Sequence, residues 1–470
     1  MTQTSKSQVV RNLPAVDKLL NEPRLKELEG QVPRSLILQA ARKTLDDLRA
    51  RILEGSTPLP DELAISRIAN QAAELAIRLA QSSMRNAINA TGVILHTGLG
   101  RAVLPEAACQ AVGSIACGHS TLEISLETGA RESRSAHFSK LLADICGAEA
   151  ALAVNNTAGA VFLALNALAC GTEVIVSRGQ LVEIGGSFRL PDIMARAGAR
   201  LVEVGTTNRT RLSDYEAAIS DDTALILRVH PSNYRIVGFT EEVPLGELVG
   251  LGRQYGIPVM DDVGSGALID MARFGLRGET MVQDSVKAGA DIITFSGDKL
   301  MGGPQAGLIV GREEILDKLA SNPLARILRI DKLTVAALEA TLRLYNDPES
   351  ITETIPTLRF IARSLEDITR SGGKLKRLVS SAVNGKAEVK LVDGVSEVGG
   401  GSLPGESLPT KLVAISAPTI NPTKTAQAFR MADPPIFGRV GEDMFLLDVR
   451  TVSDSELTAI ARAAKRIFNI

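Results

Sequence analysis

A lysine that directly follows a predicted strand is the residue best placed to carry chemistry. Lys299 comes after the apolar residues 292–295 and before the paired glycines Gly302 and Gly303. At the end of a buried strand its amine can act as a nucleophile once deprotonated, and burial or nearby cations lower the pKa of such an amine. A lone lysine in a loop is usually only solvated, so the interpretation depends on partner residues elsewhere in the chain.

Two aspartates end another predicted strand, about 40 residues before the lysine. Asp261 and Asp262 follow the apolar residues 259–260, and ligands of open α/β sheets bind outside the C-terminal ends of the strands. A carboxylate there can keep the ring nitrogen of a heteroaromatic cofactor protonated, which makes the ring an electron sink. We expect Asp261 to do so, as the first residue off the strand. The alternative is that both aspartates only cap the next segment.

A third segment, residues 154–160, has the pattern of a strand that runs through a turn into a helix. The first N–H groups of a helix bind anions, so Thr157, Ala158 and Gly159 are expected to hold a phosphate. An ordinary turn with Thr157 as helix cap is the alternative. Together, the amine, the carboxylate and the phosphate turn predict a pyridoxal 5′-phosphate enzyme with its cofactor held as a Schiff base on Lys299 and contacted by Ser296.

The elements that must position these residues alternate between short apolar runs and helical segments. Strands are predicted at residues 151–154, 174–177, 201–204, 224–229, 259–261, 292–295 and 308–310. Most of these runs are apolar throughout, as expected of parallel strands buried on both faces. The fold class is therefore α/β, with a mostly parallel, doubly wound sheet.

Three domains are predicted. Residues 1–85 form a small helical N-terminal domain, with one helix over 36–52 and a second that begins at the N-cap candidate Asp61. Residues 86–345 form the cofactor-binding α/β core. Residues 346–470 form a smaller α+β domain with several short strands, a glycine-rich loop at 399–402 and a last helix from Ser453.

Composition restricts the class of protein. The 470 residues carry a net charge of −2 and are 45% hydrophobic, with four cysteines. Those cysteines show no spacing typical of metal sites or disulfide frameworks, so we expect no metal and a reduced, cytoplasmic location. No apolar run approaches the ~20 residues of a membrane span.

Five segments resemble one family, the bacterial selenocysteine synthases, or L-seryl-tRNA(Sec) selenium transferases. The matching segments are 88–102 (INATGVILHTGLGRA), 261–266 (DDVGSG), 296–307 (SGDKLMGGPQAG), 323–329 (PLARILR) and 399–404 (GGGSLP). The resemblance extends over nearly the whole chain. It implies the aspartate-aminotransferase fold (fold type I) and conversion of L-seryl-tRNA(Sec) to L-selenocysteinyl-tRNA(Sec), with selenophosphate as selenium donor. The route would be β-elimination of the serine hydroxyl to an aminoacrylyl intermediate, followed by selenium addition.

The resemblance also assigns roles to residues. Lys299 would anchor the cofactor and remove the α-proton, and Asp298 would protonate the departing hydroxyl, although a local structural hydrogen bond is the alternative for Asp298. Arg101, Arg326 and Arg329 match anion-binding arginines of the family, which suits a compact polyanion such as selenophosphate.

Further implications concern partners. By resemblance, the helical N-terminal domain engages tRNA(Sec), and ten subunits assemble as a pentamer of dimers with sites between the two subunits of a dimer. The rival interpretations are a pyridoxal-phosphate lyase acting on a small amino acid or amino sugar without tRNA, and a tRNA-binding or assembly protein that has lost catalysis. The sequence leaves open the residue that stacks on the cofactor ring and the roles of four arginines, Arg131, Arg134, Arg439 and Arg450.

Overall fold

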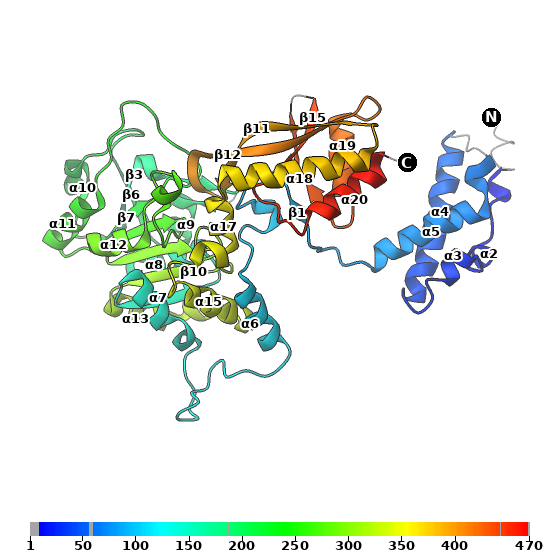
Figure 1. The fold of residues 1–470 in the computed structure, drawn as a ribbon. Coiled ribbons are helices and arrows are strands. Elements are labelled where there is room, and N and C mark those ends of the chain that lie inside the picture. Colours follow the sequence, from blue (N-terminus) through cyan, green and yellow to red (C-terminus); the bar gives the residue numbers. More distant parts are fainter. Residues whose placement is uncertain (1–8, 56–59, 187, 442, 469–470) are drawn as a thin grey trace. The chain divides into compact units, whose positions relative to one another are not determined.

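The computed structural model describes residues 9–55, 60–186, 188–441 and 443–468. The chain divides into two compact units, Met1–Asn86 and Ala87–Ile470 (Figure 1).

The N-terminal unit is helical. It contains α2 (Val16–Leu20), α3 (Pro23–Lys26), α4 (Arg34–Leu53) and α5 (Ile65–Ala80). Apolar residues of α4 and α5 pack together as its core, among them Leu45, Ile52 and Ile68. The predicted start of the second helix at Asp61 is wrong, because residues Pro60–Leu63 form a 3-10 turn and the Asp61 carboxylate pairs with Arg67 at 2.7 Å.

A seven-stranded sheet forms the centre of the second unit, with the strand order β2-β10-β9-β8-β7-β3-β6. Its strands are β2 (Ala150–Val154), β3 (Glu173–Ser177), β6 (Arg200–Val204), β7 (Thr223–Val229), β8 (Val259–Gly264), β9 (Ile292–Ser296) and β10 (Gly307–Gly311). All seven predicted runs are strands. β10 alone among them runs antiparallel to both its neighbours, and the other pairs are parallel. The expected mostly parallel α/β sheet is confirmed.

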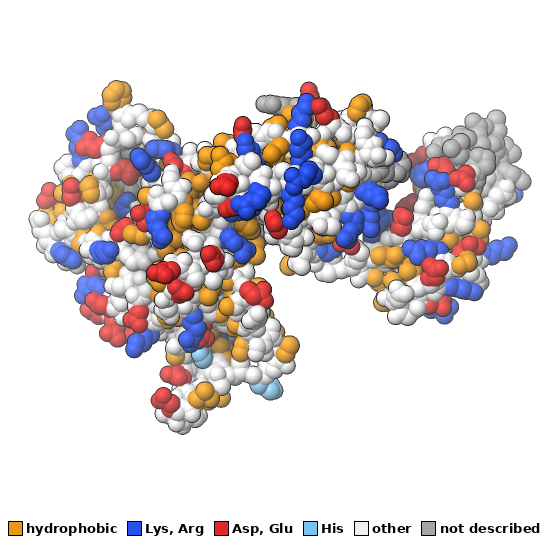
Figure 2. Space-filling view, in the orientation of Figure 1, with side chains coloured by type: hydrophobic (Ala, Val, Ile, Leu, Met, Phe, Trp, Pro, Cys, Tyr) orange, Lys and Arg blue, Asp and Glu red, His pale blue; other side chains and the backbone are white. Residues whose placement is uncertain are grey.

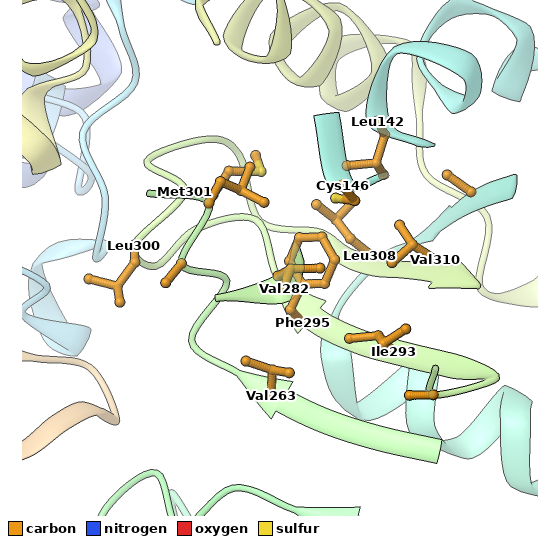
Figure 3. Packing of buried hydrophobic residues seen from close by; sticks show 14 of the residues in the cluster. Leu142, Cys146, Val263, Val282, Ile293, Phe295, Leu300, Met301, Leu308 and Val310 are labelled. Carbon is orange, nitrogen blue, oxygen red and sulfur yellow. The ribbon is translucent and has the colours of Figure 1, made fainter. Parts of the chain in front are cut away.

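Helices cover both faces of this sheet. One face packs on α8 (Thr157–Ala169), α9 (Leu190–Ala197) and α13 (Glu313–Ser321). The other packs on α7 (Ser139–Cys146), α11 (Leu245–Tyr255), α12 (Val282–Ala288) and α15 (Lys332–Leu344). On that second face, Phe295 and Ile293 lie among side chains from α7 and the neighbouring strands (Figure 3). Burial on both faces explains why most of the predicted runs are apolar throughout.

The C-terminal part contains a four-stranded sheet of order β11-β12-β15-β14. Its strands are β11 (Glu388–Gly399), β12 (Ser402–Ser416), β14 (Arg439–Gly441) and β15 (Met444–Asp448), and α18 (Leu365–Val383), α19 (Pro422–Arg430) and α20 (Leu457–Phe468) pack with it. Two strands are longer than expected, at 12 and 15 residues, and the last helix begins at Leu457 instead of Ser453.

Shorter elements complete the second unit. These are α6 (Glu106–Ala116), α10 (Leu212–Ala218), α14 (Pro323–Ile327), α16 (Ile351–Thr354), α17 (Pro356–Ala362), β4 (Glu183–Ile184), β5 (Phe188–Arg189), β1 (Ile88–Asn89) and β13 (Ile436–Phe437). β1 pairs in parallel with β13, which ties the start of this unit to its C-terminal part.

The surface is mixed in charge. Lys and Arg side chains are interspersed with Asp and Glu over the face shown in Figure 2. No helix among the described residues is long and apolar enough to cross a membrane.

Candidate active site

A cavity of about 280 Å³ opens at the C-terminal ends of the central strands. Its walls come from segments far apart in the sequence, including Arg101, Thr157, Asp262, Ser296 and Lys299. Strand ends of parallel sheets are where ligands bind in this class of fold. The sheet therefore brings most of the predicted site residues into one place.

Lys299 is held by a compact loop that follows β9. The N–H of Gly297 donates to the Ala306 carbonyl at 2.9 Å, and the N–H of Gly303 donates to the Gly297 carbonyl at 2.8 Å. The two residues after the lysine, Leu300 and Met301, are buried in the apolar cluster of Figure 3. This packing fixes the backbone on both sides of Lys299.

The Lys299 side chain is buried beside Asp262. Burial lowers the pKa of the Lys299 ammonium, and the Asp262 carboxylate opposes the shift. Burial also raises the pKa of the Asp262 carboxyl to about 6, against the hydrogen bond that Thr294 donates to it at 2.8 Å. A lysine with a lowered pKa has more of its amine in the neutral, nucleophilic form.

The structure places Asp261 away from the cavity, which corrects the expectation that it serves the cofactor. Successive side chains of a strand point to opposite faces, and Asp261 points to the face opposite Asp262. There it is fully buried, accepts a hydrogen bond from Ser285 of α12 at 2.6 Å and pairs with Arg228 of β7 at 3.0 Å. The geometry favours Asp262 over Asp261 as the carboxylate of the site.

The N-terminus of α8 forms another wall, lined by Asn156, Thr157 and Ala158. Asn156, not Thr157, caps this helix, because its side chain accepts a hydrogen bond from the N–H of Gly159 at 2.8 Å. The Thr157 hydroxyl instead lies 2.6 Å from the hydroxyl of Ser296. The turn therefore presents N–H groups and a hydroxyl pair to the cavity, the donor set that a phosphate requires.

Gly159, which was expected to hold the phosphate, does not line the cavity. The conformation of this turn also requires a glycine at position 307 of the neighbouring strand. A β-carbon on Gly307 would lie 2.1 Å from the carbonyl oxygen of Asn156. Only glycine allows β10 to approach the α8 turn this closely.

His230 lines the cavity, and it is one of four histidines among which the sequence did not choose a partner for the cofactor ring. It follows β7, and its Nδ1 is buried with no hydrogen-bond partner among the described residues. Its position directly after an apolar strand is the same signal that drew attention to Asp261. Gln305 and Ser232 line the cavity as well and also went unpredicted.

Arg101 reaches the cavity from the segment after β1. Its guanidinium pairs with the Asp298 carboxylate at 2.8 Å, and its backbone has a φ of 61°, a left-handed conformation that is uncommon for residues other than glycine. Among the predicted anion-binding arginines, Arg101 is the one that lines the cavity with Lys299.

Arg326 and Arg329 line a second cavity of about 220 Å³ together with Arg134. Within this chain they do not line the Lys299 cavity. Glu123 holds this region together. Its carboxylate pairs with Arg134 at 2.5 Å, with Arg131 at 2.7 Å and with Arg329 at 3.2 Å.

The remaining two arginines are structural. Arg439 pairs with the buried carboxylate of Asp448 at 3.1 Å, and the buried Arg450 donates to backbone carbonyls of Phe360 and Pro409. Neither lines the Lys299 cavity.

Family models and curated relatives that match this chain all describe the same family. Residues 87–453 match the family model described as L-seryl-tRNA selenium transferase, and residues 10–49 match selenocysteine synthase N terminal. The L-seryl-tRNA(Sec) selenium transferase of Moorella thermoacetica is 50% identical over 97% of this chain and 96% of its own length. That of Geobacter sulfurreducens is 47% identical over 98% of this chain and 99% of its own. Among solved structures, a D-glucosaminate-6-phosphate ammonia-lyase shares the fold, with a TM-score of 0.55 and 19% identity over 82% of this chain and 96% of that one.

Proposed function

The chain belongs to the L-seryl-tRNA selenium transferase family. From this premise we propose that it converts L-seryl-tRNA(Sec) to L-selenocysteinyl-tRNA(Sec). Selenophosphate would be the selenium donor and pyridoxal 5′-phosphate the cofactor. The observation that carries the proposal is the buried Lys299 beside Asp262, in a cavity that also receives the N-terminus of α8.

The donor set fits this cofactor. The N–H groups of Thr157 and Ala158, with the hydroxyls of Thr157 and Ser296, would hold the phosphate. Asp262 would accept a hydrogen bond from the ring nitrogen, and the unpartnered Nδ1 of His230 supplies a polar contact for the ring or its substituents. Lys299 would bind the aldehyde carbon. When bound, the cofactor withdraws electrons from the amino acid and so makes its α-proton acidic.

The residues of the chain supply the proton transfers. Lys299, with its lowered pKa, would take the α-proton of the seryl group. Asp298 is next to Lys299 in the chain and also lines the cavity, and it would pass the proton that Lys299 has removed to the departing hydroxyl. Arg101 would bind the selenophosphate, since a guanidinium matches the geometry of a phosphate oxygen pair.

In this proposal the N-terminal unit binds the tRNA. Support comes from the match of residues 10–49 to the selenocysteine synthase N terminal model and from the exposed arginines of α4, such as Arg34 and Arg42. Assembly into a decamer of five dimers stays a prediction, as does a cytoplasmic location. A partner subunit would be needed to bring Arg326 and Arg329 to the Lys299 cavity.

The direct test supplies the purified, cofactor-loaded protein with seryl-tRNA(Sec) and selenophosphate. Formation of selenocysteinyl-tRNA(Sec), detected after hydrolysis of the ester, is the expected result. Absence of this product together with ammonia release from free small amino acids or amino sugars would favour a lyase that needs no tRNA. Absence of both activities in protein that has bound the cofactor would favour the non-catalytic alternative.

A further inference from the structure

A third hollow, larger than the Lys299 cavity, adjoins that cavity. It has a volume of about 360 Å³ and lies between Ser232–Asn233 and residues 399–407, a hairpin segment made of the end of β11, the connecting loop Gly400–Gly401 and the start of β12. Ser232 lines both hollows. A β-carbon built on Gly401 would lie 3.6 Å from Nζ of Lys299 and 3.6 Å from Cβ of Ser232. The two hollows therefore meet beside the lysine amine.

The loop that forms this hollow is held in a fixed conformation. Gly399, Gly400 and Gly401 all have positive φ, and a β-carbon on Gly400 would lie 2.9 Å from Cβ of Leu95. Leu403 also has a positive φ, of 52°, and its N–H donates to the Glu279 carboxylate at 3.1 Å. A non-glycine residue in this conformation is strained and persists only where its surroundings hold it there. The loop is thus preformed.

Two buried hydroxyls in this hollow have no partner. Ser232 and Ser402 are each 3% exposed, and neither hydroxyl has a hydrogen-bond partner among the described residues. Buried polar groups in folded proteins are nearly always hydrogen-bonded, so an unpaired one indicates a missing ligand or water. Two such groups on residues that line one hollow point to a bound water or to a ligand with hydroxyl or amine groups.

The charge of the walls restricts that ligand further. The described residues that line the hollow include two carboxylates, Glu397 and Glu406, and no lysine or arginine, although Glu406 pairs with Arg235 at 4.0 Å. A carboxylate accepts hydrogen bonds and repels anions. The walls therefore suit a neutral group rich in hydroxyl and amine donors and are unsuited to a phosphate or to the selenium donor.

We propose that this hollow binds the terminal nucleoside of the aminoacylated acceptor end, the ribose that carries the seryl ester and its adenine. This inference rests on the proposed function. The seryl α-carbon must lie at Lys299 to lose its proton, and the ester continues from that carbon to the ribose. Beside the lysine, the hollow at Ser232 and Ser402 offers acceptors for the ribose hydroxyl and for the adenine amino group.

The test compares two probes on the cofactor-loaded, full-length protein. One probe is 3′-(L-serylamino)-3′-deoxyadenosine, a stable amide analogue of the aminoacylated nucleoside, and the other is L-serinamide. We expect the nucleoside probe to bind about tenfold more tightly or better, since it adds several hydrogen bonds. Ser402→Ala should weaken the nucleoside probe by roughly threefold to tenfold, the loss of one neutral hydrogen bond, and leave serinamide binding unchanged.

Kinetics give a second readout. Ser402→Ala should raise KM for seryl-tRNA(Sec) by a similar factor and leave kcat and KM for selenophosphate unchanged. Because the Ser402 hydroxyl has no partner among the residues that the structure describes, the variant loses no hydrogen bond to them and should fold normally. Ser416→Ala, at the other end of β12, is the matched control and should change neither KM nor probe binding.

Two results would overturn the inference. Equal binding of the nucleoside probe by the parent and Ser402→Ala, confirmed with Glu397→Gln, would show that the hollow does not contact the nucleoside. A rise of KM for selenophosphate in place of seryl-tRNA would identify a donor site. A different result would reject the proposed function alone. In that case the parent makes no selenocysteinyl-tRNA(Sec), although the nucleoside probe still binds and Ser402→Ala still weakens its binding.

Discussion

The guanidinium of Arg101 donates a hydrogen bond of 2.8 Å to the carboxylate of Asp298, the residue that precedes Lys299. The residue expected to bind the selenium donor is therefore paired with the residue expected to donate a proton. Selenophosphate bound at Arg101 would compete with Asp298 for the same guanidinium N–H groups. Its binding should therefore free the Asp298 carboxylate to pass a proton to the departing hydroxyl. This pairing gives a physical reason for the two steps to be coupled.

Arg101→Ala tests this relationship. We expect KM for selenophosphate to rise about tenfold to a hundredfold, the cost of a lost hydrogen bond to a charged group. Cofactor absorbance should be retained, because Arg101 is not among the residues assigned to the cofactor. Arg101→Lys should recover only part of the loss, since an ammonium keeps the charge and lacks the planar pair of donors. An unchanged KM in both variants would refute the anion role.

Lys299→Ala should abolish covalent attachment of the cofactor. Borohydride reduction of the loaded parent is expected to fix one cofactor on the peptide that contains Lys299, as read by mass spectrometry. The variant should show no fixed cofactor and no selenium transfer, while its folded state is checked by circular dichroism. Label found on another lysine of the parent would overturn the site assignment.

The neighbouring aspartates should respond differently to the same substitution. Asp262→Asn removes the carboxylate of the cavity and should lower kcat on the order of a hundredfold, as for other lost electrostatic contacts in active sites. Asp261→Asn leaves Arg228 without its buried partner and should lower the free energy of unfolding by about 2–4 kcal/mol. Urea unfolding and kcat of both variants separate the two roles, and the reverse pattern would restore Asp261 as the cofactor residue.

These aspartates also show how far the sequence alone could lead. All seven strands of the sheet were recognisable because each contains a short apolar run, and most of these runs are uninterrupted. The same burial on both faces removes the alternation that would reveal which side chain points where, so nothing in residues 259–262 distinguished Asp261 from Asp262. The sequence also could not show that Arg326 and Arg329 line a cavity separate from that of Lys299. Their position depends on contacts between distant segments, such as the ion pair between Arg329 and Glu123. The domain boundaries at 85 and 345 stay predictions.

The pH dependence of stability should carry the signature of Asp262. Its pKa is raised to about 6 from an ordinary 3.8, so the folded state binds a proton more tightly than the unfolded state. The resulting stabilisation is complete below about pH 4 and is lost as pH rises through about 6, a change of about 3 kcal/mol. Urea unfolding of cofactor-free parent and Asp262→Asn from pH 4 to 8 should show this difference, with the variant relatively more stable at high pH.

Cofactor loading provides the control for that measurement. A ring nitrogen that shares a proton with Asp262 favours the ionised carboxylate. The loaded parent should therefore lose most of the pH-dependent difference between 4 and 6. If loaded and cofactor-free parent show the same difference from the variant across this range, Asp262 does not face the ring nitrogen.

Charge reversal on α4 tests the tRNA-binding role of the N-terminal unit. Arg42 is exposed and has no ion-pair partner among the described residues, whereas Arg49 on the same helix pairs with Asp46 at 2.7 Å. If α4 contacts phosphates, Arg42→Glu should weaken tRNA(Sec) binding by roughly threefold to tenfold and reduce the slope of log K against log salt concentration by about 1. Arg49→Glu should have a smaller effect, because its guanidinium is already partly neutralised.

Lys390→Glu, on β11 of the other unit, is the control. Equal losses in all three variants would indicate only a general electrostatic attraction, and no loss at Arg42 would place the tRNA contacts elsewhere.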